Sequence, residues 1–174
     1  LLREWSNYAL LGAVSPDLPY LGGSNKWADR FHYKRTSQIV REGLVTLSGK
    51  SFDDVDTQKQ IAWLFGYVTH LVTDLYIHPV IEKKVGPYAE NATEHRICEM
   101  NQDVWIVKKE MFNDVGRCEM FDNTIKTCTE DGVEGYFVDD VVSKFWKLLI
   151  KKRQFLLTLY ILLSIKNPSP SDKL

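Results

Sequence analysis

Apolar residues recur at helical spacing along most of this chain. The strongest stretch lies between residues 61 and 76, where apolar side chains follow one another at intervals of three and four, the period of an α-helix: Ile61, Leu64, Phe65, Val68, Leu71, Val72, Leu75 and Tyr76. Asp53 and Asp54 open this helix, and Gly86-Pro87 breaks the chain after it. Pro79 is predicted to lie near its end or to kink it, because proline disrupts a helix interior.

Weaker patterns of the same period predict further helices on both sides of this one. They cover residues 1–13, a short segment around Trp27 to His32, and residues 36–47, 92–112, 138–150 and 151–165. Pro16, Pro19 and Gly22-Gly23 place Asp17 in a loop between the first two. Residues 113–135 are the least regular part, and no alternating strand pattern stands out.

The fold class predicted from these elements is all-α, a helical bundle in which neighbouring helices run antiparallel. The 174 residues suggest one domain, which we expect to cover residues 1–166. Residues 167–174 contain two prolines and two serines and are predicted to form a disordered tail.

Net charge and hydropathy argue against an extended nucleic-acid-binding surface and against a transmembrane helix. The formal net charge is -1, which argues against an extended nucleic-acid-binding surface, because such surfaces rest on clustered lysine and arginine. The longest apolar run, residues 155–165, is too short for a transmembrane helix, which needs about 20 residues. The compartment stays open between the cytoplasm and secretion after removal of an upstream signal. The oligomeric state is unknown at this stage.

The four histidines of the chain carry its chemistry. His70, Asp74 and His78 stand four residues apart on the long helix, so their side chains form a column on one face. Imidazole and carboxylate groups are ligands that zinc takes. The column is too long for one ion, but it suits two neighbouring ions with Asp74 as a bridge between them.

The next helix repeats this arrangement. His95 and Glu99 are again four residues apart, and Asp103 continues the line. Two helices that present such faces to each other make a metal site inside a bundle, with Asp17 and His32 added from the loop and short helix upstream. The alternative is a polar structural network, since buried ionisable groups are costly unless they are paired or bound to metal.

These motifs resemble those of the zinc-dependent phospholipases C. The resemblance rests on GAVSPD at residues 12–17, WADRFHY at residues 27–33, GYVTHLVTDLYIHP at residues 66–79 and the later His95-x-x-x-Glu99. It covers roughly residues 8 to 105, and all four histidines fall on it. The fungal single-strand-specific nucleases share this helical fold, so the pattern is more specific for the metal centre than for the substrate.

The resemblance implies a ligand set and a catalytic group. Those matching one zinc are Asp17, His32, His70 and Asp74, and those matching a second are His78, His95 and Glu99. Asp74 also matches the carboxylate that bridges toward a third ion, which the family completes with the N-terminal amine and a nearby histidine. This chain starts with Leu1 and has no histidine before Asp17, so we expect two or three ions. Asp17 matches a candidate general base.

Other carboxylates and other metals complete the set of hypotheses. Asp29 and Asp103 are candidates to accept the free N–H of a metal-bound histidine, as carboxylates around metal sites commonly do. Manganese or iron suits the same ligands as zinc.

The expected activity is hydrolysis of a phosphate ester, with phospholipid as a candidate substrate, because a bound metal activates water and neutralises phosphate charge. One alternative is a nuclease or nucleotide phosphatase on the same scaffold. Another is a metal-binding module without catalysis, to which the missing third-site groups point. Residues 113–166 match nothing recognisable.

Overall fold

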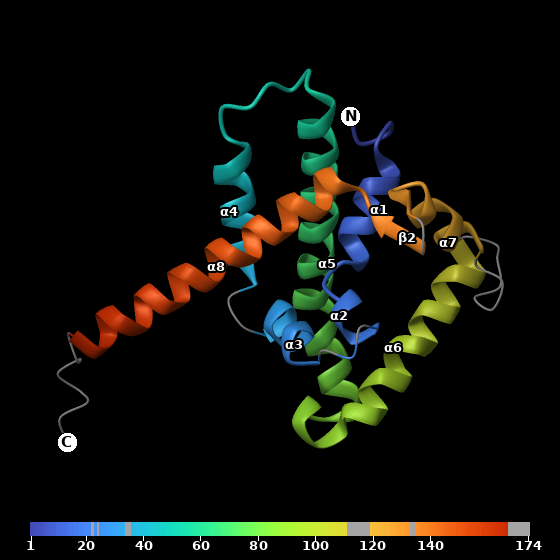
Figure 1. Cartoon of the computed structure of the whole chain (residues 1–174). Coiled ribbons are helices and arrows are strands. Elements are labelled where there is room, and N and C mark those ends of the chain that lie inside the picture. The colour runs from blue at the N-terminus through green and yellow to red at the C-terminus, as the bar shows by residue number, and fades with distance from the viewer. Residues whose placement is uncertain (22, 24, 34–35, 111–118, 133–134, 167–174) are drawn as a thin grey trace.

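A computed structural model of the chain is all-α apart from one short hairpin (Figure 1), and it describes residues 1–21, 23, 25–33, 36–110, 119–132 and 135–166. The helices are α1 (Ser6–Val14), α2 (Leu18–Leu21), α3 (Asn25–Tyr33), α4 (Ser37–Leu47), α5 (Val55–Val85), α6 (Tyr88–Glu110), α7 (Glu119–Lys126) and α8 (Asp140–Lys166). Strands β1 (Thr129–Gly132) and β2 (Gly135–Val138) lie between α7 and α8. The expected disordered tail and the last residues of the helix predicted over 92–112 lie outside the described residues.

Helix α5 is the centre of the molecule. In Figure 1 it stands upright, with α1 along one side, α4 and α8 on the other, and α6 running away from its lower end. The side chain of Asp54 caps its first turn by accepting the Thr57 N–H at 2.9 Å. Gly86, with φ 97°, ends it. Pro79 does not end the helix, which continues to Val85, so the boundaries predicted from Asp54 and Gly86 are confirmed.

Three local expectations were wrong. Leu18–Leu21 forms one helical turn rather than loop, because Pro19 lies in its first turn, where proline is tolerated. Residues 129–132 and 135–138 pair as two antiparallel strands, with Thr129 opposite Val138. Each strand is too short for alternation to be visible in the sequence. The last two predicted helices are one continuous helix, α8, since Ile150 and Lys151 contain no breaker.

The described core packs the first half of α5 against α1, α3, α4 and α8. Trp63 and Tyr67 are fully buried at its centre, where the Trp63 ring meets Phe145 edge-on at 5.9 Å between centroids. The second half of α5 is less buried than the first. Val72 is 47% exposed and Leu75 71%, because α6 diverges from α5 and covers only one face of it.

Two glycines allow α1 and α5 to approach backbone to backbone. A Cβ atom on Gly66 would lie 1.8 Å from the Ala9 carbonyl oxygen, and one on Gly12 would lie 1.9 Å from the Trp63 carbonyl oxygen. Neither clash can be relieved by turning a side chain. The α1–α5 contact therefore requires glycine at both positions.

We expect Gly66→Ala to destabilise the protein by about 2 kcal/mol, the cost typical of overpacking a tight interior. Urea unfolding followed by circular dichroism measures the change. Gly49→Ala is the reference variant, because a Cβ there meets no atom within 4 Å. Its φ of 79° is strained for alanine, so this variant measures the backbone cost of replacing a glycine without a clash. A Gly66→Ala variant as stable as the wild type would contradict the close packing of α1 on α5.

No helix among the described residues combines the length and apolarity needed to cross a membrane.

Candidate metal centre

The residues expected to bind metal come together from four parts of the fold. His70, Asp74 and His78 line one face of α5, and α6 brings His95 and Glu99 against it. The remaining two lie on the other side of the column, His32 on α3 and Asp17 just before α2. The structure arranges these side chains in two clusters.

The first cluster converges on the Nε2 atom of His32. That nitrogen lies 3.0 Å from Asp17 Oδ1 and 3.1 Å from His70 Nε2. Asp74 Oδ2 is 3.2 Å from His70 Nε2 and 4.0 Å from His32 Nε2. Ligands of one tetrahedral zinc ion at 2.0–2.2 Å lie about 3.3–3.6 Å from each other. The observed spacings bracket that range.

The second cluster converges on Glu99. Its Oε1 atom lies 3.1 Å from His95 Nε2 and 3.3 Å from His78 Nε2. His95 is buried, whereas His78 and Glu99 are partly exposed. The cluster therefore has one wall in the protein interior and one side open to solvent.

Asp74 joins the two clusters. Its Oδ2 atom faces His70 in the first, and its Oδ1 atom lies 3.9 Å from His78 Nε2 in the second. Oδ2 is buried and accepts no hydrogen bond from the described residues. A buried carboxylate oxygen without a donor is costly, and a shared cation would remove that cost.

The position of the proton on the neutral His32 ring is also compatible with a bound cation. Its Nδ1–H donates to the Ala28 carbonyl at 2.8 Å, which leaves the lone pair of the neutral ring on Nε2. That lone pair points toward the oxygen of Asp17 and the nitrogen of His70, two groups that repel it unless a proton or metal ion lies between them. The donor set therefore suits a metal such as zinc.

The electrostatics of the first cluster favour positive charge. Burial alone would lower the pKa of His32, but its hydrogen bonds with Asp17 and the Ala28 carbonyl raise that pKa above its ordinary value. Burial would raise the pKa of Asp17, but the hydrogen bond from His32 and the charges of His70 and Arg96 hold it below its ordinary value. Without a cation, the cluster stabilises imidazolium beside carboxylate.

A buried hydrogen-bond chain fixes the segment that carries Asp17. The indole N–H of Trp63 donates to Ser15 Oγ at 2.9 Å, and the Ser15 hydroxyl donates to the Leu11 carbonyl at 2.6 Å. Ser15 is fully buried. Asp17 follows two residues later, so the core of α5 sets the direction in which the chain leaves α1.

The two outer carboxylates lie differently. Asp29 is exposed, and its Oδ1 accepts the Tyr20 hydroxyl at 3.4 Å. Burial and the charge of Glu99 raise the pKa of Asp103, against the opposing charge of Arg96, so Asp103 lies near the second cluster. That either carboxylate accepts the N–H of a metal-bound histidine stays a prediction.

Two tyrosines adjoin the clusters in a way that residue spacing did not reveal. The ring of Tyr20 packs on His32 at 5.8 Å between centroids, and that of Tyr88 meets His95 edge-on at 5.1 Å. Nothing in the sequence singled out Tyr88.

An apolar groove of about 730 Å³ lies between the end of α5 and the outer side of α6. Ile77, Ile97 and Trp105 contribute to its lining, and none of the candidate metal ligands does. The groove and the two clusters are therefore separate features of the α5–α6 pair.

Comparison with known proteins gives one match. Residues 1–155 match the family model described as zinc dependent phospholipase C. No curated protein matches, and no solved structure matches. The match extends past residues 8–105, where the motifs lie, so it includes most of the region that resembled nothing recognisable.

Proposed function

Because the chain belongs to the zinc-dependent phospholipase C family, we propose that it hydrolyses phosphate esters by means of metal-activated water. The observation that carries the proposal is the pair of clusters joined by the two oxygens of Asp74. Neighbouring metal ions that share a carboxylate are typical of enzymes that stabilise both the attacking and the leaving oxygen of a phosphate ester.

Each cluster has its own task in this proposal. One zinc ion would be held by Asp17, His32, His70 and Asp74, and a second by His78, His95 and Glu99. When bound, the metal would lower the pKa of water toward neutrality and neutralise the phosphate oxygens. Catalytic zinc sites keep a position for water beside their protein ligands, and the second ion would keep one beside His78, His95, Glu99 and the shared carboxylate of Asp74.

Asp17 is the residue that we assign to proton transfer. Its side chain is 54% exposed, more than that of His32, His70 or Asp74, so it borders solvent where a substrate enters. Its depressed pKa keeps it ionised near neutral pH. It can therefore accept a proton from water and still attract a cation through its second oxygen.

The number of ions in the proposal is two. The described residues present two groups of three ligands. The substrate that we propose is a phospholipid, in keeping with the family. A nuclease or nucleotide phosphatase would use the same centre, and the assay below separates these activities.

The test compares substrates with and without metal. The zinc-loaded protein is assayed on bis(4-nitrophenyl) phosphate, phosphatidylcholine vesicles, single-stranded DNA and a nucleoside monophosphate, then again after chelation and after zinc is returned. We expect hydrolysis of the diester and the vesicles that chelation abolishes and zinc restores.

Asp17→Asn should lower kcat by about 100-fold or more, the typical contribution of a general base. Asp53→Asn, which changes an exposed acid before α5, should leave kcat unchanged. Turnover of DNA or the nucleotide alone would replace the phospholipid in the proposal. A metal-loaded protein that turns over none of the four substrates would contradict the enzyme and favour a binding module.

A further inference from the structure

His95 lacks the contact that usually fixes the orientation of a metal-binding histidine. A ligating imidazole normally donates its other N–H to a carboxylate, carbonyl or water, which sets the direction of the ring. His32 follows this rule through Ala28. His95 is 1% exposed, and no described residue hydrogen-bonds its buried Nδ1 atom. The described contacts of the ring are that of Nε2 with Glu99 Oε1 at 3.1 Å and two aromatic contacts.

Two aromatic rings pack against the ring of His95. The ring of His78 meets that of His95 at 5.0 Å between centroids and 86° between planes, and the ring of Tyr88 meets it at 5.1 Å and 89°. Edge-to-face contacts of this kind are preferred between aromatic rings. His78 is itself a candidate ligand, so Tyr88 is the contact that lies outside the donor set.

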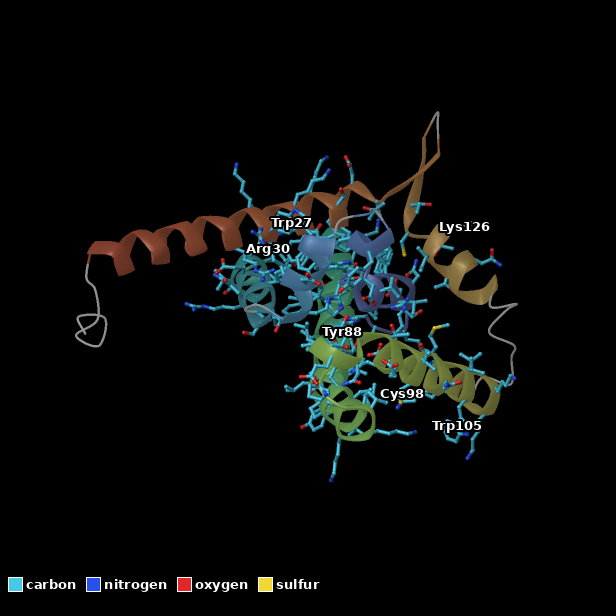
Figure 2. All side chains as sticks on the ribbon, turned by 90° about the horizontal axis from the view of Figure 1, so that it is seen from below. Trp27, Arg30, Tyr88, Cys98, Trp105 and Lys126 are labelled. Atoms are coloured by element: carbon cyan, nitrogen blue, oxygen red, sulfur yellow. The ribbon has the colours of Figure 1, made fainter. Side chains whose placement is uncertain are left out.

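The backbone brings Tyr88 to this position. Tyr88 is the first residue of α6, and the helical geometry is broken at Asn91, with φ −131° and ψ 36°. The Tyr88 N–H lies 3.4 Å from Glu82 Oε1, at the end of α5. Figure 2 shows Tyr88 where α6 meets α5, apart from Cys98 and Trp105 further along the helix.

We propose that Tyr88 is a positioning residue of the metal centre, which sets the orientation of His95 by ring packing in place of a hydrogen bond. The inference rests on the proposed function, because it takes the second cluster to be a metal site. The ring, rather than the hydroxyl, performs this role.

The first cluster provides a matched control. Tyr20 also packs on a candidate ligand, His32, at 5.8 Å between centroids and 38° between planes, but the His32 ring is fixed by Ala28 as well. Loss of the Tyr20 ring should therefore change metal binding much less than loss of the Tyr88 ring. Tyr76, which is 71% exposed on α5, controls for removal of a tyrosine as such.

The experiment measures metal affinity rather than turnover. The metal-free protein and its variants Tyr88→Ala, Tyr88→Phe, Tyr20→Ala and Tyr76→Ala are titrated with zinc against a chelator and with cobalt(II), whose visible absorption reports ligand geometry. Glu99→Ala identifies which binding step belongs to the second cluster. We expect Tyr88→Ala to weaken that step by about tenfold or more, as loss of an outer-shell partner does, and to alter its cobalt spectrum. Tyr88→Phe should match the wild type.

The outcomes separate this inference from the function on which it rests. A Tyr88→Ala variant with wild-type affinities and cobalt spectrum would overturn the positioning role while the metal centre stands. A wild-type protein that binds neither metal would overturn the proposed function. Tyr88 is 39% exposed, so its truncation leaves little cavity. If circular dichroism shows that the metal-free Tyr88→Ala variant is unfolded, Tyr88→Leu replaces it in the titrations. Leucine keeps the apolar volume but has no flat ring, so its metal affinity tests the same role.

Discussion

Asp74→Asn is expected to lose both bound metal ions and to lower hydrolysis of a phosphodiester by more than about 100-fold, because even the loss of a group that only supports a ligand costs about 10- to 100-fold. The reason is the position of the carboxylate, whose two oxygens face His70 in one cluster and His78 in the other. The amide keeps the shape but offers one acceptor oxygen and no charge. Elemental analysis of the purified variant, beside its kcat, provides the measurement.

Variants that remove a ligand from one cluster only are the controls for Asp74→Asn. His70→Ala and Glu99→Ala each remove a ligand from one cluster only, so each should retain about one zinc equivalent. Asp53→Asn should retain the full content. If Asp74→Asn kept both ions while His70→Ala lost one, the bridging role of Asp74 would be wrong. If none of the three ligand variants changed the metal content, the clusters would be a polar network and the hydrolase proposal would fail.

The second large effect concerns stability. Asp139 precedes α8 and is 7% exposed. Its Oδ2 atom accepts hydrogen bonds from the Tyr8 hydroxyl at 2.6 Å and from Lys59 Nζ at 2.8 Å. Its Oδ1 atom accepts one from the Val141 N–H. Asp139→Ala would leave a partly buried ammonium and a buried hydroxyl without this acceptor, and α8 without its cap. We expect a loss of about 3 kcal/mol, the lower end for one partner of a buried ion pair.

Urea unfolding of the metal-free protein measures this loss without interference from the metal centre. The matched control is Asp140→Ala, because that neighbouring carboxylate is 59% exposed and pairs with Lys144 on the surface. Its removal should cost less than about 1 kcal/mol. Equal effects of the two substitutions would show that the buried network around Asp139 does not stabilise the fold as described.

The same stability difference should depend on pH. Burial would raise the pKa of Asp139, but the hydrogen bonds from Lys59 and Tyr8 hold it below its ordinary value. A depressed folded-state pKa contributes stability that is complete above the unfolded pKa of about 3.9 and is lost as pH falls through the folded value. The wild type should therefore converge on Asp139→Ala below about pH 4. Burial, followed by the bond to Asp139, raises the pKa of Tyr8 to about 12, which keeps this donor protonated at neutral pH.

Sequence patterns predicted those parts of the fold where local signals agree with tertiary packing. Asp54 and Gly86 mark the ends of α5 because each satisfies a backbone requirement that any helix of this length has. The exposure of Val72 and Leu75 could not be predicted, because a helical period gives the direction of a face but not whether another helix covers it. That depended on the angle at which α6 leaves α5.

The candidate site was predictable where it depends on spacing within one helix. Residues four apart must share a face, which placed His70 beside Asp74 and His95 beside Glu99. The contact of Tyr88 with His95 was not predictable in this way. Seven residues of regular helix would set the two about 10.5 Å apart along the axis, and the break at Asn91 changes that relation.

The helix that carries the most candidate ligands is held by the core over only half of its length. Trp63 and Tyr67 anchor the first half of α5, and among the described residues the apolar core cluster includes none from α6. Bringing α6 against α5 therefore depends largely on the groups that share the metal, so ion binding and ordering of this helix pair are one linked equilibrium. Only the second cluster joins the two helices, since the first takes its ligands from α3, α5 and the segment before α2. The apparent dissociation constant of an ion in the second cluster should therefore include the free energy of that ordering, whereas that of an ion in the first cluster should not.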